Sequence, residues 1–402
     1  MNITLICGHY LPDLGYIEVH LARALADLGH AVSVVTSSAV PRYVAHLQGP
    51  VEVGTEHDGK VKVIRLKPQF ELGQVVTAKG VNAAVLGENP DLLIAIGLGK
   101  RFPKPVFGLG IPVITLFGDN LHSYAGTTFA DDSGVRMERL KIKLHFAAFK
   151  ASVYRKAVEK SDLSAAYTPE SFEAAAGMLH GRFRKKLLRQ DFFISLGFDP
   201  RKFYFDPELR NEARTRAGIP PSGKVVITAT RPVPEKRLER AFSLFAALPA
   251  EWIWMTVGHT DTDYSRQFCR KAEQALGKDR FKALPHSDHK RLNALYNAAD
   301  IALYTVPAIS VFEAIGTGLP CVLPDVRSLS HIGAHAEHVG YYSDLSDASV
   351  AEKVRGVASS PQERGRRAEA ACATFSWRNV ARRLLETAAE KGILPKGAER
   401  NP

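Results

Sequence analysis

Short apolar runs alternate with amphipathic helical stretches along most of this chain, and this alternation constrains its fold more than any other feature. The run at 2–7 is followed by a turn-rich loop, by apolar residues at helical spacing over 17–28, and by a second run at 31–36. The same order returns from residue 225 to about 342. Strands connected through helices lie parallel, so the sequence predicts an α/β protein with two doubly wound, Rossmann-like domains. Further strands are expected at 61–65, 92–96, 113–116, 192–196, 252–257 and 281–284.

Length and composition narrow the class of protein. A chain of 402 residues can bury two cores, and its net charge of +11 suits an anionic partner. The first residues lack the basic region of a signal peptide, and no apolar run reaches the roughly 18 residues of a membrane span. The four cysteines show no metal-binding spacing. These features predict a cytoplasmic protein with free thiols.

The stretch from 308 to 325 is expected to form a loop, a short helix, a loop and a buried strand. Glu313 is the only charge inside its helix, and a carboxylate there needs a partner or a ligand. Backbone N–H groups in the first turn could hold a phosphate, while Glu313 could accept hydrogen bonds from ribose hydroxyls. The residues of that first turn are Ile309, Ser310, Val311 and Phe312. A buried helix with a solvated or capping glutamate fits the same pattern.

Two basic residues flank the loop that follows the strand at 225–229. Arg231 stands at the end of the strand and Lys236 at the start of the next helix. Ligands of open α/β sheets bind beyond the carboxyl ends of the strands. Arg231 and Lys236 are therefore expected to converge on a diphosphate.

Polar and basic residues of the first domain give weaker signals. Asp119 and His122 follow the strand at 113–116 and are candidates for a catalytic site, although each taken alone is more typical of a turn beside a helix start. Basic residues crowd 136–160 and 182–189, which indicates either a solvated face or docking on anionic lipid. Aromatic residues do not interleave with these bases, so nucleic-acid binding is not expected.

Several motifs, in order along the chain, resemble those of one family. They are Gly15 before the first helix, Leu196-Gly197, Arg231 with Lys236 in an Arg-x-x-x-x-Lys pattern, Asp300-Ile301, Glu313-Ala314 with Gly318 and Pro320, and Ser376-Trp377. Together they resemble the retaining GT-B glycosyltransferases of family four, also called glycosyl transferases group 1. The resemblance extends over most of the chain, from residue 1 to about 390.

The resemblance implies a GT-B fold whose two domains face a cleft. Residues 1–200 would form the acceptor domain, 201–375 the nucleotide-sugar donor domain, and 376–392 a helix that crosses back to the first. It also implies transfer of a sugar from a UDP- or GDP-type donor with retention, without a metal or another cofactor. Arg231, Lys236, Asp119 and His122 would be catalytic. The donor-binding residues would be Gly15, Tyr16, Leu284, Ile309, Ser310, Val311, Phe312 and Glu313.

Three positions depart from the family pattern: Tyr16 replaces a glycine, Phe117 a histidine, and Thr305 the first glutamate of a Glu-x7-Glu motif. All three concern the donor sugar. Two alternatives therefore stay open, namely a catalytically idle nucleotide-sugar-binding protein that supports a partner, and a nucleotide-sugar epimerase. If the chain is a transferase, the family implies synthesis of cell-surface polysaccharide or glycolipid, with an acceptor sugar or lipid-linked sugar at the inner membrane face.

Overall fold

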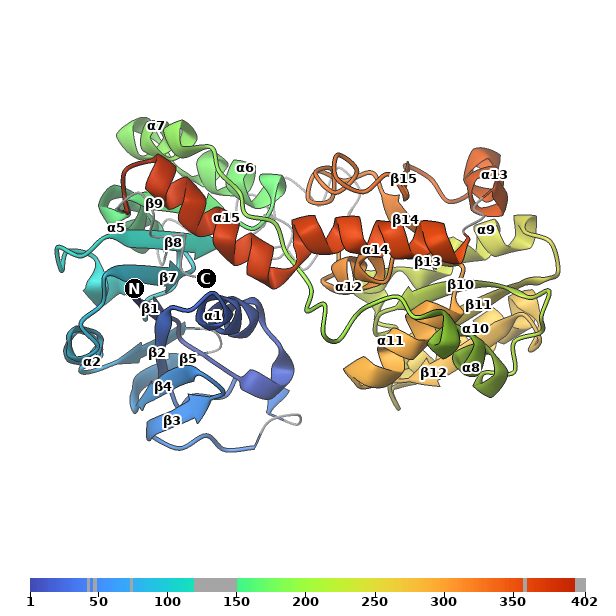
Figure 1. Ribbon diagram of the computed structural model, residues 1–402, viewed down its shortest axis with the longest axis horizontal. Helices are drawn as coiled ribbons and strands as arrows, with labels where there is room; N and C mark the ends of the chain where they lie inside the picture. The colour runs from blue at the N-terminus through green and yellow to red at the C-terminus, as the bar shows by residue number, and fades with distance from the viewer. Residues whose placement is uncertain (42–43, 46–48, 73–74, 119–149, 357–359, 395–402) are drawn as a thin grey trace. The chain divides into compact units, whose positions relative to one another are not determined.

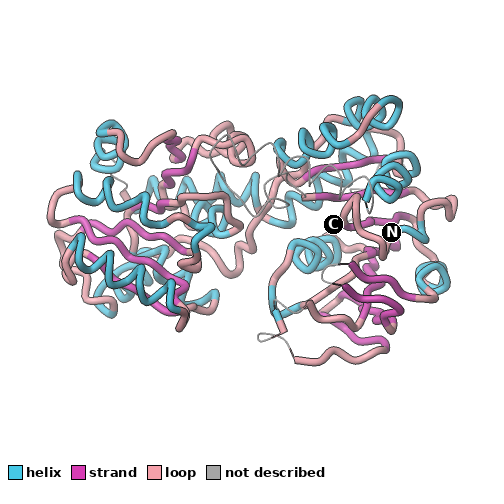
Figure 2. The backbone as a smooth tube through the Cα atoms, turned by 180° about the vertical axis from the view of Figure 1, so that it is seen from behind, coloured by secondary structure: helices cyan, strands magenta, loops and turns pink. Residues whose placement is uncertain are grey.

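The computed structural model describes residues 1–41, 44–45, 49–72, 75–118, 150–356 and 360–394. The chain forms two units, one of Met1–Ser195 with Trp377–Pro402 and one of Leu196–Ser376. The division falls a few residues before the boundary predicted near residue 200. Each unit contains a sheet flanked by helices (Figures 1 and 2).

The first unit is built on a seven-stranded sheet with the order β3-β4-β2-β1-β7-β8-β9. All its neighbouring strands pair in parallel except β3 with β4. The strands are β1 (Asn2–Ile6), β2 (Ala31–Ser37), β3 (Gly54–Asp58), β4 (Val61–Leu66), β7 (Leu92–Ile96), β8 (Val113–Phe117) and β9 (Leu163–Ala166), and a separate hairpin joins β5 (Pro68–Leu72) to β6 (Val75–Ala78). The central strands are almost fully buried, as expected for a parallel sheet covered on both faces.

Six helices with described boundaries accompany this sheet. They are α1 (Ile17–Asp27), α2 (Val81–Gly87), α5 (Ala151–Lys160), α6 (Pro169–Met178), α7 (Gly181–Gln190) and α15 (Trp377–Glu390). Helix α15 comes from the end of the chain and packs on α1, where the rings of His20 and Trp377 stack with centroids 5.3 Å apart. Arg378 also donates a hydrogen bond of 2.9 Å to the carbonyl of Asp27, at the end of α1. These contacts place the last helix in the first unit.

The second unit is built on a six-stranded sheet in which every neighbouring pair is parallel, with the order β12-β11-β10-β13-β14-β15. Its strands are β10 (Lys224–Ala229), β11 (Trp252–His259), β12 (Phe281–Pro285), β13 (Ile301–Leu303), β14 (Cys321–Pro324) and β15 (Val339–Tyr342). Its helices are α8 (Pro207–Arg216), α9 (Ala241–Ala247), α10 (Asp263–Leu276), α11 (His289–Ala298), α12 (Ser310–Gly316), α13 (Ala348–Gly356) and α14 (Pro361–Phe375). Because side chains alternate along a strand, β11 contributes Met255 to the core under α8, α11, α12 and α14, and Trp254 to the core under α9, α10 and α13.

One expected strand is wrong. Residues 192–196 make a single bridge, between Ala166 and Phe193, and no strand. Ser195 has φ 69°, in the left-handed region, and this backbone conformation interrupts extended pairing. The prediction failed because the apolar composition of the segment does not reveal that conformation.

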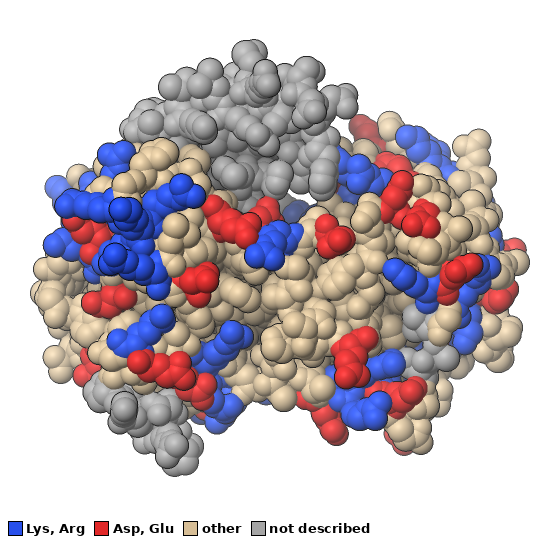
Figure 3. All heavy atoms as spheres, turned by 90° about the horizontal axis from the view of Figure 1, so that it is seen from above, with Lys and Arg blue, Asp and Glu red and all other residues tan. Residues whose placement is uncertain are grey.

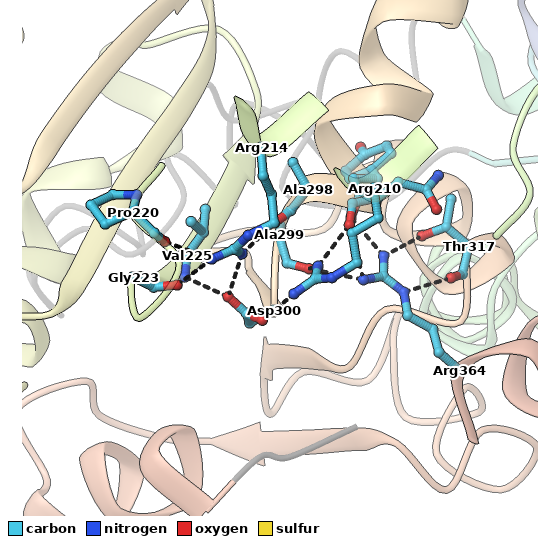
Figure 4. A network of polar contacts seen from close by, with 12 residues as sticks. Arg210, Arg214, Pro220, Gly223, Val225, Ala298, Ala299, Asp300, Thr317 and Arg364 are labelled. Atoms are coloured by element: carbon cyan, nitrogen blue, oxygen red, sulfur yellow. Dashed lines mark hydrogen bonds and ion pairs between the residues drawn. The ribbon is translucent and has the colours of Figure 1, made fainter. Parts of the chain in front are cut away.

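Three arginines cap the carboxyl end of α11 (Figure 4). Arg210 donates to the carbonyls of Asn297 and Ala299, each at 2.7 Å, and Arg214 donates to that of Ala298 at 3.0 Å. The buried guanidinium of Arg364, from α14, donates to the carbonyls of Tyr296, Asn297, Ala299 and Thr317 at 2.6–3.2 Å. The last carbonyls of a helix lack partners within it and carry the negative end of its dipole, so these cations satisfy both needs. Asp300 balances part of the charge through ion pairs with Arg210 and Arg214.

Removal of the buried arginine should therefore destabilise the second unit. Replacing Arg364 with alanine leaves the Thr317 carbonyl and part of the α11 cap without donors, so we expect a loss of about 3–5 kcal/mol in the free energy of unfolding. Arg366→Ala, on the exposed side of the same helix, is the matched control and should change it little. Urea titration measures the free energy of unfolding of both variants and of wild type. Equal stability of Arg364→Ala and Arg366→Ala would contradict a capping role for Arg364.

Candidate functional site

Helix α12 is held in place by packing on both of its ends. Val311, Phe312 and Ile315 are buried in the core of the second unit. A Cβ atom at Gly316 would lie 2.4 Å from the ring of Phe198, so only glycine permits this approach. In the first turn, the hydroxyl of Tyr304 donates to the Ser310 carbonyl at 2.7 Å. The position of every side chain on this helix is thus determined by neighbours.

Glu313 is partly buried on α12. Burial raises the pKa of its carboxyl to about 7, and the nearby charge of Lys202 opposes the rise. Among the described residues, no side chain or backbone group forms a hydrogen bond or ion pair with this carboxylate. A carboxylate in such a place gains stability from any ligand that brings hydrogen-bond donors.

Two of the four backbone amides expected to bind a phosphate at the start of α12 already form hydrogen bonds within the protein. The N–H of Val311 donates to the Ala308 carbonyl at 3.2 Å and that of Phe312 to the Ile309 carbonyl at 2.9 Å. The chain enters the helix through this tight turn, which uses the two donors internally. The Ser310 hydroxyl donates to the Ala229 carbonyl at 2.9 Å, at the end of β10. Only the amides of Ile309 and Ser310 are left to meet an anion.

The basic loop after β10 is tied to the loop before α12. Lys236 is half-buried, and its pKa is lowered by burial and by the charge of Arg231, which is exposed. The hydroxyl of Thr305 donates to the Lys236 carbonyl at 2.5 Å. Gly258, at φ 113°, lets β11 approach this loop, because a Cβ there would lie 3.0 Å from the Thr230 backbone. Thr305, which occupies the place of a glutamate in the expected motif, thus acts as a tether.

In the first unit, Gly15 and Tyr16 lead into α1 as expected. Gly15 has φ 60°, and Tyr16 is the residue that precedes the helix. Tyr16 lines a cavity of about 190 Å³, which Gly15 does not line. Phe117 is buried in the core of this unit. Asp119 and His122, predicted as catalytic, lie outside the described residues.

The basic and acidic residues of that cavity were not predicted from the sequence. They are His9, Glu18, Lys100 and Arg101. Burial raises the pKa of Glu18 to about 7 and lowers that of His9 to about 4. The Nε2 atom of His9 has no hydrogen-bond partner among the described residues. Glu18 could have been found, because it follows the Gly15-Tyr16 loop in the first turn of α1.

Leu284 packs against the apolar core to which Val311 and Phe312 of α12 belong. It lies in β12 and lines a larger cavity of about 1160 Å³, to which Glu313, Arg231 and Lys236 do not contribute. Within the described ranges, no group of three or more His, Cys, Asp or Glu side chains could hold a metal ion. The described helices also include none with the length and apolarity to cross a bilayer.

Comparison with known proteins adds a family and a fold. Residues 210–373 match the family model for glycosyl transferases group 1. Among solved structures, the chain is similar to sucrose-phosphate synthase from Thermosynechococcus elongatus, with a TM-score of 0.64, 18% identity, and coverage of 97% of this chain and 98% of that one. It is also similar to Anabaena HepE in complex with UDP (TM-score 0.66, 16% identity, 97% and 100% coverage). A third similar structure is WaaG, a glycosyltransferase involved in lipopolysaccharide biosynthesis. Its TM-score is 0.59 and its sequence identity 16%, with coverage of 96% of this chain and 98% of that one. No curated protein sequence matches the chain.

The two doubly wound units, aligned over nearly their whole length with these structures, have the GT-B fold, which confirms the predicted fold class. The segment 210–373, which matches the model for glycosyl transferases group 1, contains the motifs around Arg231, Lys236 and Glu313 on which the expected resemblance rests.

The raised pKa of Glu313 gives a prediction about stability. In the folded protein this carboxyl binds a proton up to about pH 7, whereas its ordinary value is 4.5. Between those values the folded state holds more protons than the unfolded one, so stability falls as pH rises through this window. Glu313→Gln removes that loss, and its melting temperature relative to wild type should increase from about pH 5 to about pH 8.

Glu352→Gln, at an exposed position of α13, is the matched control. The difference in melting temperature between this control and wild type should stay constant from about pH 5 to about pH 8. A constant difference in melting temperature for Glu313→Gln as well would contradict the raised pKa of Glu313.

Proposed function

We propose that this protein is a retaining glycosyltransferase that uses a nucleoside-diphosphate sugar. The observation that carries the proposal is a hydrogen bond that connects two loops of the second unit. Thr305 bonds to the Lys236 carbonyl, and Glu313 follows Thr305 within the family-matched segment. This arrangement gives a phosphate-binding cation and a ribose-binding carboxylate a common support.

The proposed chemistry needs negative charge to be stabilised as the diphosphate leaves the anomeric carbon. Lys236 and Arg231 supply positive charge, and the amides of Ile309 and Ser310 supply donors. Burial and the charge of Arg231 lower the pKa of Lys236, so an anionic leaving group beside its ammonium would favour the charged form. We propose that these groups act without a metal, and that the acceptor attacks from the face of the leaving group.

One observation favours the idle nucleotide-sugar binder as a second candidate. The single hydroxyl proton of Thr305 is committed to the Lys236 carbonyl, whereas a glutamate at this position could reach a sugar hydroxyl. Turnover separates the two candidates. Release of free sugar or transfer to an acceptor indicates a transferase, and nucleotide binding without turnover indicates the binder.

The ligands of similar proteins support a proposal about the substrates. HepE is described in complex with UDP, with UDP and glucose, and with UDP-glucose. WaaG is described as involved in lipopolysaccharide biosynthesis. We therefore propose a UDP-type donor, with GDP-type as the other choice, and an acceptor sugar or lipid-linked sugar of a surface glycan.

Turnover should depend strongly on the two cations. Lys236→Ala and Arg231→Ala each remove a group that faces the leaving diphosphate, and we expect each to lower turnover by about 10²–10³-fold. Release of sugar from a panel of UDP- and GDP-sugars is followed by mass spectrometry, with and without excess chelator. Lys271→Ala, exposed on α10, is the control and should keep wild-type turnover.

Two results would contradict this account. Near wild-type turnover in both variants would remove Arg231 and Lys236 from the reaction. Loss of activity in chelator, restored by magnesium or manganese, would show that a metal serves the diphosphate instead.

The basic surface of the first unit supports a proposal about location. Lys and Arg side chains gather over part of this unit (Figure 3). Helix α7 carries the exposed residues Arg184, Lys185 and Arg189, and its Leu188 is 46% exposed. Arg182 pairs with Glu159, and Lys186 donates to the carbonyls of Glu159 and Ser161, so these two help to hold the helix in place. The other predicted bases between 136 and 149 lie outside the described residues.

We propose that α7 docks on anionic membrane, since each cation near such a surface adds about 1 kcal/mol. Arg184→Glu/Lys185→Glu should therefore lower co-sedimentation with anionic vesicles at low salt, and salt should weaken wild-type binding. Lys60→Glu/Lys67→Glu makes the same charge change elsewhere on the unit and should not affect binding. Equal recovery of wild type in the supernatant with neutral and anionic vesicles would refute docking and favour a soluble acceptor.

A further inference from the structure

The cavity of about 1160 Å³ in the second unit has an apolar floor. Its lining comes from the segment before α8, from α8 and α11, and from β11 and β12. The apolar residues of the floor include Leu209, Ala213, Met255, Leu284, Ala294 and Leu295. Tyr204, a large side chain with 45% exposure, stands beside it. A concave, largely apolar space of this volume is large enough to hold a small molecule.

The rim of the same cavity is strongly basic. Its cations are Arg201, Lys202, Arg216, Lys282, Lys290 and Arg291, and the one carboxylate among the lining residues is Asp288. Asp288 uses its carboxylate to cap α11, where it accepts from the Arg291 N–H at 2.7 Å. Arg201 is paired with Asp199 and Arg216 with Glu212. The side chains of Lys202, Lys282, Lys290 and Arg291 have no hydrogen bond or ion pair with any described residue.

Apart from the charged residues and Tyr204, the polar side chains among the lining residues are those of His289 and Asn293. The Oδ1 atom of Asn293 accepts from the Tyr204 N–H at 3.1 Å. His289 lies with its ring edge-on to Phe203, at a centroid distance of 5.7 Å. Most of the uncharged lining is therefore apolar. What remains is apolar area bordered by unpaired positive charge.

We propose that this cavity binds the phosphate and the hydrocarbon chain of a single lipid-phosphate molecule. The chain would cover the apolar floor, which is favourable in proportion to the area removed from water. The phosphate would lie among Lys282, Lys290 and Arg291 and accept charge-assisted hydrogen bonds. The Lys236, Arg231 and Glu313 side chains do not line the cavity, whereas Lys202, whose charge acts on Glu313, does.

Two variants test the site through different properties. Lys290→Glu/Arg291→Glu reverses the rim, and glutamates in the first turn of α11 are favoured by the helix dipole, so this variant should fold. Ala294→Trp fills the floor and leaves the rim charges in place. The matched controls lie on α10, at exposed positions: Arg270→Glu/Lys271→Glu and Ala275→Trp.

The probe is dodecyl phosphate, titrated by calorimetry below its micellar concentration into the full-length protein. We expect saturable binding that each site variant weakens by about tenfold or more and that neither control changes. Inorganic phosphate alone and dodecyl maltoside, which has the same chain and a neutral head, should bind far more weakly.

Each of the following results would overturn the proposal. If dodecyl maltoside bound as tightly as dodecyl phosphate, the rim charges would play no part in binding. If inorganic phosphate bound as tightly as dodecyl phosphate, the apolar floor would play no part. Unchanged binding in both site variants, or no binding at all, would show that the cavity is not the site. Displacement of dodecyl phosphate by UDP would assign the cavity to the donor nucleotide.

Discussion

The capping of α11 by three arginines is the interaction on which the second unit depends most. Arg364 is buried, and it reaches from α14 to the end of α11 and to Thr317, directly after α12. One charged side chain thus joins three helices. Gly318 follows Thr317 with φ 66°, and a Cβ there would lie 2.0 Å from the Arg364 carbonyl, so the backbones are in contact as well. The position of Glu313 on α12 is therefore set by a buried cation that takes no part in the proposed chemistry.

The candidate site also contains buried charged groups, but among the described residues they lack the partners that the charged groups of the cap have. In the cap, buried charge is compensated by carbonyls and by Asp300. At the site it is left uncompensated: burial raises the pKa of Glu313 and lowers that of Lys236. Both shifts mean that the charged form is less favoured in the folded protein than in water. A nucleoside diphosphate would bring ribose hydroxyls to one group and an anion to the other, so its binding would relieve both.

The fold could be read from the sequence wherever apolar periodicity was strong. The strand at 92–96 has the predicted boundaries, and α12 followed by β14 was expected from Glu313, Gly318 and Pro320. Strand β3, Gly54–Asp58, was missed because it is polar and exposed, and is held by its pairing with β4. At the site, the positions of Arg231, Lys236 and Glu313 followed from motif spacing. The internal hydrogen bonds of Val311 and Phe312 and the role of Thr305 as a tether depend on loop geometry, which residue types do not specify.

The central claim is that Glu313 and the basic loop hold one nucleoside diphosphate between them. Calorimetric titration of UDP, and of uridine as the ligand without phosphates, tests this role of Glu313 in wild type, Glu313→Ala and the exposed control Glu352→Ala. We expect Glu313→Ala to weaken the binding of both ligands by roughly 1.5–3 kcal/mol, the range for hydrogen bonds to charged groups, and the control to change neither. Unchanged affinity of Glu313→Ala for UDP and for uridine would exclude Glu313 from nucleotide binding.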